Sequence, residues 1–201
     1  PWFAEAGELS SALEANGGWT PTQRERATEL ARRMLAWGRV LQKNGFAPET
    51  VEAVFRRAHG MPSVDPAPMN SGWTKIAALA TAYLEGHPSR YPHVIWDSRV
   101  STSLTSRLEH AMVTRGMRDS SRVFPRIGAV AGRGGSRPRP LQLRWAWAYG
   151  SWSSQEAGSE LVREIRDVLN GEDHAPMPGV DGGEEPWTVR GVESVLFMDG
   201  Y

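Results

Sequence analysis

The chain contains no cysteine among its 201 residues. A disulfide framework, a thiol nucleophile and a thiolate-bound metal ion are therefore excluded. The sequence also lacks an apolar run of roughly 18 residues or more, which a transmembrane helix would require, and it has no recognisable signal peptide. We therefore expect a soluble, cytoplasmic protein that does not bind membranes.

Lysine is scarce as well. Only Lys43 and Lys75 are lysines among the 23 basic residues, and the rest are arginines. An amine can become neutral and act as a nucleophile, whereas a guanidinium stays charged. Lys75 stands where a turn-like segment, residues 70–74, runs into an apolar helix, and Asp97 stands at the start of another expected helix. We interpret Lys75 as a nucleophile and Asp97 as its carboxylate partner.

Taken alone, each of these two residues has a simpler interpretation. Lys75 can be a solvated lysine in the first turn of a helix, and Asp97 can be a helix N-cap, where aspartate is favoured. Attack by a lysine near neutral pH requires burial or a positive neighbour, because a free lysine amine has a pKa of about 10.4. A helix N-terminus beside Trp73 and Ile76 offers both. Capping and catalysis are compatible roles for Asp97, since a capping carboxylate is held rigidly.

The net charge is zero, but the charges are segregated along the chain. Residues 1–98 carry ten basic and ten acidic side chains, and residues 151–201 carry three arginines against eleven acids. Between them, residues 99–150 carry ten arginines against only Glu109 and Asp119. A basic stretch of this kind is typical of a surface that binds phosphate. The alternative is that the basic and acidic segments pair with each other in the fold.

Apolar residues recur at helical spacing along most of the chain, and no strand-like alternation is evident. A capping box at Thr20 and Gln23 begins the clearest helix. The pattern predicts helices over residues 20–41, 48–59, 73–84, 98–112 and 153–170, and from 188 towards the C-terminus. Residues expected to face the core include Trp37, Tyr83, Val168 and Val195. Proline and glycine break residues 61–72 into a loop. We therefore predict a predominantly helical, all-α fold.

Two motifs and the chain end resemble those of a known family. The segment Ser71-Gly72-Trp73-Thr74-Lys75-Ile76-Ala77 is similar to a Gly-Val-Gly-Thr-Lys-Val-Ala hairpin that opens a helix. The segment Ile95-Trp96-Asp97-Ser98-Arg99-Val100 stands where the family has Pro-Val-Asp followed by a helix. With the terminal run Val195-Leu196-Phe197-Met198-Asp199-Gly200-Tyr201, they resemble the helix-hairpin-helix DNA glycosylases, closest to a bacterial 8-oxoguanine DNA glycosylase (OGG-fold) type. The likeness covers roughly residues 45–115 and the last fifteen, and departs where Ser71 and Trp73 replace glycines.

The resemblance implies a single OGG-fold domain over residues 1–201, with two helical subdomains flanking a cleft. The hairpin and catalytic helices would span about 48–115, a basic loop 126–140, and the C-terminal helices about 153–201. The implied activity is that of a DNA N-glycosylase, which flips and excises a damaged or modified base and leaves an abasic site. The implied partner is double-stranded DNA, bound by a monomer in a bacterial cytoplasm. Without cysteine, the iron–sulfur cluster of some relatives is excluded, and no cofactor is expected.

The same resemblance places the DNA contacts. We expect the hairpin to offer backbone N–H groups to phosphate at a helix start, and arginines to contact the DNA backbone. The expected DNA-binding residues are Asn70, Ser71, Gly72, Thr74, Arg99, Arg133, Arg137 and Arg139. An ordinary capped turn and a surface loop are the alternatives for the hairpin and for residues 126–140. The five histidines show no metal-ligand spacing, so we expect no metal site.

Two groups of aromatic residues stand out. Trp73 and Trp96 flank the predicted catalytic pair, and we expect them to line a pocket for the extruded base. A second group consists of Trp145, Trp147, Tyr149 and Trp152, at near-alternate positions. Stacking on a base is one role for these residues, but we expect them to form core.

Two other functions remain open. One is a non-catalytic DNA-binding module with the same fold, for which Lys75 would be dispensable. The other is an unrelated Schiff-base enzyme acting on small carbonyl compounds, which would show no salt-dependent DNA affinity. Within the glycosylase hypothesis, 8-oxoguanine in repair competes with a hypermodified base of phage DNA in a defence role. Strand nicking by β-elimination is a further step open to a lysine nucleophile.

Overall fold

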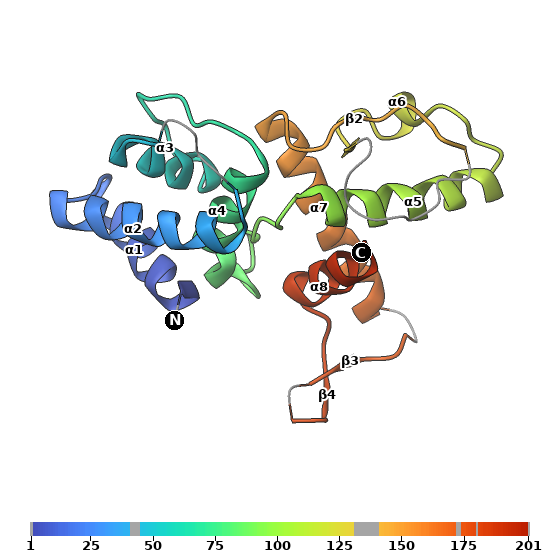
Figure 1. Cartoon of the computed structure of the whole chain (residues 1–201). Coiled ribbons are helices and arrows are strands. Elements are labelled where there is room, and N and C mark those ends of the chain that lie inside the picture. Colours follow the sequence, from blue (N-terminus) through green and yellow to red (C-terminus); the bar gives the residue numbers. More distant parts are fainter. Residues whose placement is uncertain (1, 41–44, 131–140, 172–173, 180, 201) are drawn as a thin grey trace. The chain divides into compact units, whose positions relative to one another are not determined.

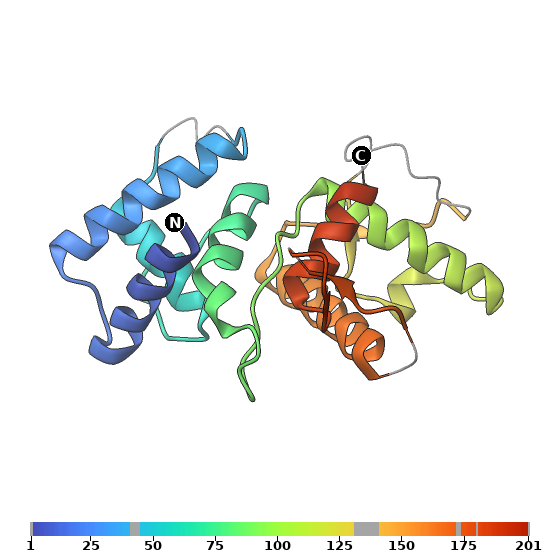
Figure 2. The same ribbon diagram turned by 90° about the horizontal axis from the view of Figure 1, so that it is seen from below.

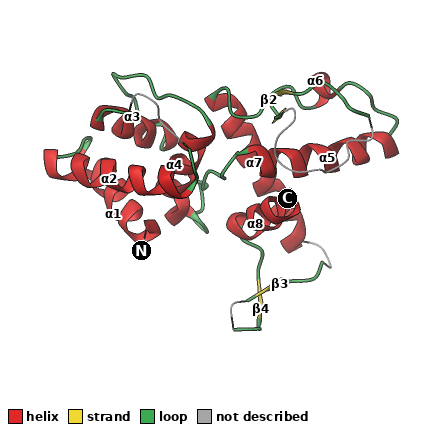
Figure 3. Cartoon of the chain, in the orientation of Figure 1, coloured by secondary structure: helices red, strands yellow, loops and turns green. Residues whose placement is uncertain are grey.

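The computed structural model describes residues 2–40, 45–130, 141–171, 174–179 and 181–200 (Figures 1 and 3). This part of the chain is predominantly helical, and its strands are only two residues long, so the predicted all-α class is confirmed. The chain forms two compact units, residues 1–95 and 96–201. Across the described ranges, no helix is both long enough and apolar enough to cross a membrane.

The first unit consists of four helices and one 3-10 turn. They are α1 (Trp2–Asn16), α2 (Pro21–Trp37), α3 (Pro48–Ala58), α4 (Ser71–Thr81) and η1 (Ala82–Leu84). Helix α4 is the centre of this unit, because it packs against α1, α2 and α3 (Figure 2). All its residues from Gly72 to Thr81 are buried. A polar side chain on α4 is therefore placed in the interior of the unit.

The helix boundaries follow local signals in the sequence. The Thr20 hydroxyl oxygen accepts a hydrogen bond from the N–H of Gln23, and the Gln23 Oε1 accepts one from the N–H of Thr20, so the predicted capping box is confirmed. Helix α2 ends at Trp37 rather than near residue 41, because Gly38 caps it and Arg39 turns the backbone left-handed at φ 51°. As a result Trp37 does not face the core and is 56% exposed. Helix α1 was not predicted, and residues 41–44 lie outside the described residues.

The second unit is built on three longer helices. Its elements are α5 (Ser98–Thr114), α6 (Ser120–Val123), β1 (Gly128–Ala129), β2 (Ala146–Trp147), α7 (Trp152–Gly171), β3 (Met177–Pro178), β4 (Glu184–Glu185) and α8 (Val189–Asp199). Helix α8 packs against both α5 and α7. Strands β1 and β2 pair in parallel, and β3 and β4 pair antiparallel. Thr188 caps α8 as the sequence predicts.

Three residues expected to face the core do not. Val168 is 50% exposed and Val195 is 48% exposed, and in the first unit Tyr83 is 39% exposed. Apolar spacing alone misplaces Val168, because no residue of α7 beyond Val162 is buried. Tyr83 lies in η1, past the end of α4, where the helical spacing no longer applies.

Candidate active site

Lys75 lies in the first half of α4, and its side chain is almost wholly buried, with 5% exposed. Its Nζ donates a hydrogen bond to the carbonyl oxygen of Ser71 at 3.1 Å. Its methylene chain passes Gly38, where an added Cβ would lie 2.9 Å from Cδ and 3.0 Å from Cε. Lysine is among the residues least often buried. The alternative of a solvated surface lysine is therefore wrong.

A substitution at Gly38 should displace the Lys75 side chain while leaving the lysine itself unchanged. Its backbone has φ −72° and ψ −1°, which alanine adopts without strain. We expect Gly38→Ala to change the free energy of unfolding by less than about 1 kcal/mol, because only a flexible side chain must shift. Any reaction that depends on the Lys75 amine should slow by about tenfold or more, because the amine leaves its position. Urea unfolding and single-turnover base release measure the two effects.

The matched control for this variant is Gly171→Ala at the end of α7. An added Cβ there meets no atom within 4 Å, so both stability and rate should stay close to those of the parent. An unchanged rate in Gly38→Ala would show that the position of the Lys75 side chain does not matter to the reaction.

Asn70 caps α4, and the capping differs from the expected hairpin. Its Oδ1 accepts hydrogen bonds from the N–H groups of Gly72 at 2.8 Å and Trp73 at 3.1 Å. Ser71, Gly72 and Thr74 are helical residues rather than turn residues, and Gly72 and Thr74 are buried. Two N–H groups that we expected to be offered to phosphate are thus already bound within the protein. The DNA contacts of this segment stay a prediction, and they would require these bonds to open.

Asp97 is the N-cap of α5. Its Oδ1 accepts from the N–H groups of Arg99 at 3.0 Å and Val100 at 3.3 Å, which fixes the carboxylate at the positive end of the helix. The residue is 8% exposed. The predicted cap is therefore confirmed. Lys75 belongs to the first unit and Asp97 to the second, so their pairing stays a prediction.

Trp73 and Trp96, expected to line a base pocket, are both buried in this structure. Trp73 is 2% exposed and meets Phe46 edge to face, with ring centroids 5.3 Å apart. Trp96 is 0% exposed and covers Gly158, where an added Cβ would lie 2.6 Å from its Cε3. Each indole thus fills the core of its own unit, so burial does not support the predicted pocket role.

The predicted arginine contacts are described only in part. The guanidinium of Arg99 lies 4.8 Å from the centre of the Phe197 ring, within range of a cation–π interaction. Gly200 packs closely on the backbone of Arg99. Gly200, which follows α8, therefore packs on the first turn of α5. Arg133, Arg137 and Arg139 lie outside the described residues.

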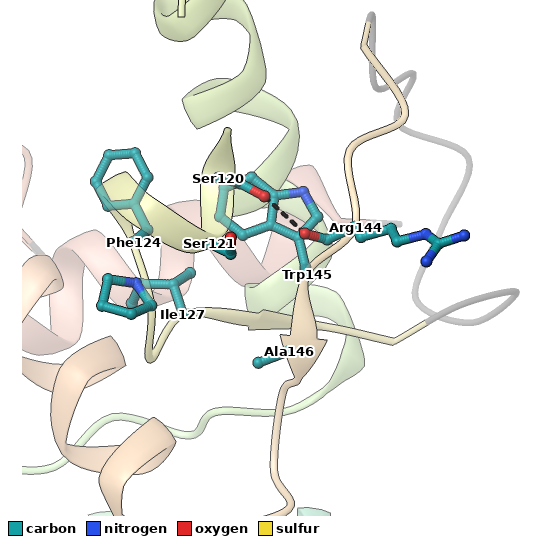
Figure 4. A pocket seen from close by; sticks show the side chains of 8 residues that line it. Ser120, Ser121, Phe124, Ile127, Arg144, Trp145 and Ala146 are labelled. Carbon is teal, nitrogen blue, oxygen red and sulfur yellow. Dashed lines mark hydrogen bonds between the residues drawn. The ribbon is translucent and has the colours of Figure 1, made fainter. Parts of the chain in front are cut away.

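A cavity of about 270 Å³ lies beside α6 in the second unit (Figure 4). Its lining includes Ser120, Phe124, Ile127, Arg144, Trp145 and Ala146. The Phe124 and Trp145 rings stack with centroids 6.1 Å apart and 29° between their planes. The Ser120 hydroxyl donates to the carbonyl oxygen of Arg144 at 2.6 Å, which ties α6 to the segment before β2. This is a pocket that the sequence did not predict.

The aromatic run that contributes Trp145 is not core. Trp147 is 53% exposed, and Tyr149 meets it edge to face with centroids 5.4 Å apart. Trp145, Tyr149 and Trp152 are each half-buried. The expectation that this run forms core is therefore wrong for Trp147. The density of aromatic residues over 145–152 was the sequence feature that could have located the cavity. Nothing in the sequence around Phe124 marked that residue as part of its lining.

A buried carboxylate holds the wall of this cavity. Glu109 on α5 is 0% exposed and accepts hydrogen bonds from the backbone N–H groups of residues 141, 142 and 143 at 2.9–3.0 Å. It also accepts one from the indole N–H of Trp145 at 2.9 Å. The backbone becomes left-handed at Gln142 (φ 47°) as it wraps around the carboxylate. One acid thus satisfies four donors and fixes the Trp145 ring.

A second polar cluster of the first unit joins side chains of α1, η1 and two loops. The Tyr83 hydroxyl donates to Glu14 at 2.9 Å, and Arg90 contacts both Glu14 and the His59 ring. Burial lowers the pKa of His59 to about 4 and raises the pKa of Tyr83 to about 12. Burial alone would raise the pKa of Glu14, but hydrogen bonds from Arg90 and Tyr83 lower it below its usual value. Burial also lowers the pKa of His93 to about 4.

The lowered pKa values of His59 and His93 predict that the folded chain loses stability in mild acid. Between pH 6.5 and 4 an unfolded chain protonates His59 and His93, whereas the folded chain keeps them neutral. The unfolded state then binds more protons, so stability is complete above about pH 6.5 and falls as the pH drops towards 4. We expect a loss of about 2 kcal/mol per histidine, measured by urea unfolding at pH 7.5, 5.5 and 4.5. His59→Gln should flatten this dependence and the exposed His174→Gln should not; a flat profile in the parent would contradict the prediction.

Comparisons of the chain with protein-family models, with curated proteins and with solved structures found no match.

Proposed function

We propose that this chain is a DNA N-glycosylase that excises a damaged or modified base, with Lys75 as the nucleophile and Asp97 as its carboxylate partner. The observation that carries the proposal is the burial of Lys75, one of two lysines in the chain, at 5% exposure on the central helix of its unit. Lysine is almost never fully buried unless it is paired, and lysine rather than arginine can serve as a nucleophile. The likeness of both motifs to the glycosylase family supplies the reaction type.

The chemistry needs an amine that can give up its proton. The neutral amine attacks C1′ of the target nucleotide, the C1′–N bond breaks, and the base leaves with the bonding electrons and takes up a proton. Opening of the sugar then gives a Schiff base between Lys75 and C1′. Hydrolysis of this Schiff base restores the amine and leaves an abasic site. Removal of a C2′ proton instead would break the strand by β-elimination.

Asp97 suits the role of carboxylate partner because its side chain is held in one position. A carboxylate that accepts two backbone N–H groups at a helix start cannot swing away as charge develops. It would stabilise the cationic sugar and pass the proton between amine and base. We propose a monomer acting on double-stranded DNA in the bacterial cytoplasm, in a helix-hairpin-helix glycosylase fold. Ser71 and Trp73, in place of the family's glycines, favour a hypermodified phage base over 8-oxoguanine.

The test is a panel of duplex oligonucleotides that carry oxidised bases or phage-type modified cytosines. After incubation, heating in alkali cleaves the strand wherever a base has been removed. The proposal expects cleavage in at least one duplex and none in the unmodified control. Duplex binding without cleavage across the panel would overturn the enzyme and favour a non-catalytic DNA-binding module. A chain that neither cleaves nor binds DNA would favour the small-carbonyl alternative.

A further inference from the structure

We propose that the cavity beside α6 holds the base of an unpaired DNA nucleotide, while Arg118, Arg122 and Arg144 contact the neighbouring phosphates. The choice of DNA rests on the proposed function, but the binding itself does not require Lys75 or Asp97. All the residues concerned belong to the second unit.

The size and walls of the cavity suit a single flat ring system. Its volume of about 270 Å³ lies just below the range of roughly 300–1,000 Å³ that is usual for drug-sized ligands. The Phe124 and Trp145 rings form an apolar wall, and Ser120 and Ile127, both buried, contribute further lining. Bases stack on such rings whatever their sequence, because every base has a π-face. Trp147, exposed on the neighbouring strand, offers a second surface for an adjacent base.

The wall is held in place before any ligand arrives. Glu109 fixes the indole of Trp145 and the backbone that precedes it, and Ser120 fixes the carbonyl group of Arg144. A rigid pocket loses little conformational entropy on binding. The four donors on Glu109 therefore serve binding as well as stability.

The charge around the cavity suits a polyanion. Arg144 lines the cavity, Arg122 lies on α6 and Arg118 shortly precedes that helix. All three side chains are exposed, and Arg122 has a charge interaction with Asp119. Figure 4 shows the Arg144 side chain pointing away from the aromatic rings, where a flanking phosphate rather than a base would lie. The nearby acid, Asp119, is occupied by the Ser121 hydroxyl at 2.6 Å and the Arg122 N–H at 3.1 Å. Arg126, by contrast, forms a salt bridge with Glu160 at 3.3 Å.

The decisive comparison uses two fluorescent probes of equal length and charge: a twelve-nucleotide oligothymidylate and an abasic tetrahydrofuran backbone without bases. The parent chain should bind the oligothymidylate about tenfold more tightly by fluorescence anisotropy, since only that probe fills the cavity. Phe124→Leu should remove most of this difference while leaving the abasic probe unaffected. Phe3→Leu, at an exposed position on α1, is the control and should preserve the difference.

A second variant guards against a folding defect in Phe124→Leu. Ala146→Leu fills the mouth of the cavity from an exposed position on β2, and it should likewise abolish the preference for bases. Replacement of the three arginines by glutamine should weaken both probes equally. It should also reduce the slope of log affinity against log salt by about two, because three phosphate contacts are lost. The control replaces three salt-bridged arginines of α2 by glutamine, and it should leave the affinity for both probes and the salt slope close to those of the parent. These arginines are Arg26, Arg32 and Arg33.

Equal affinity of the parent for the two probes would overturn the proposal, as would equal losses for both probes in Phe124→Leu and Ala146→Leu. An oligouridylate that binds more than tenfold tighter than the oligothymidylate would overturn the choice of DNA. The outcome is separable from base excision, because neither probe carries a modified base. Excision that survives in Ala146→Leu at the parent rate, with the base preference absent, would show that the cavity binds a base without taking part in excision. Absence of excision in the parent, with the base preference intact, would overturn the glycosylase and leave the cavity as a binding site.

Discussion

Replacing Lys75 by glutamine is expected to abolish base release, with a fall in the single-turnover rate of at least about a thousandfold. Glutamine keeps much of the side-chain volume over Gly38 but has no amine to attack C1′. The rate is measured with enzyme in excess over whichever modified duplex responds in the panel. Because Lys75 is buried, urea unfolding of the variant must accompany the kinetics.

Lys75→Arg distinguishes a nucleophilic role of Lys75 from a purely electrostatic one. A guanidinium keeps the charge but cannot become a nucleophile near neutral pH. If Lys75 acts as the nucleophile, the arginine variant should be as inactive as the glutamine variant. Substantial activity in the arginine variant would assign Lys75 an electrostatic role instead.

The largest effect on stability is expected at Glu109. Glu109→Ala would remove the fully buried carboxylate that three backbone N–H groups and the indole N–H of Trp145 share as their acceptor. We expect a loss of about 3–5 kcal/mol, because each buried donor that is stranded costs about 1 kcal/mol or more. The urea concentration at the unfolding midpoint measures this loss.

The control for Glu109 is Glu164→Ala on α7, at an exposed position, where the change should stay within about 0.5 kcal/mol. Glu109→Gln should fall between the two, because an amide keeps one acceptor oxygen but turns an NH₂ group towards donors. A Glu109→Ala chain as stable as its parent would show that the segment 141–145 can satisfy its N–H groups in another way.

Local signals predicted the local structure well. Thr20 and Gln23 form the capping box, Thr188 caps α8 and Asp97 caps α5, because each cap needs only a few neighbouring residues. Helix boundaries that depend on tertiary contacts were harder to predict. Helix α2 stops at Trp37, where Gly38 makes room for Lys75 of another helix, and no local pattern encodes that contact. Glu109 is likewise matched to donors more than thirty residues away.

The candidate site was predicted in part. Lys75 and Asp97 were singled out through residue type and motif, and the structure shows each of them hydrogen-bonded within its own unit. Trp73 and Trp96, which we expected to line a pocket, are buried, and Trp147, which we expected in the core, is exposed. A sequence shows that indoles are numerous but not which of them lies inside. Trp96 fills the core over Gly158, whereas Trp145 lines the cavity with Phe124. Gly158, which makes room for Trp96, comes from a helix more than fifty residues further along the chain, so no local pattern reveals it.

The central claim is that Lys75 forms a covalent bond with the sugar, and borohydride trapping tests it most directly. The reducing agent converts a Schiff base between Lys75 and C1′ into a stable amine, which appears as a protein–DNA adduct on a denaturing gel. The parent chain should give this adduct with the duplex that responds in the alkali panel. Peptide mapping should place the link on Lys75, and Lys75→Gln should give no adduct. Base release without any trapped adduct, or an adduct that persists in Lys75→Gln, would contradict the account.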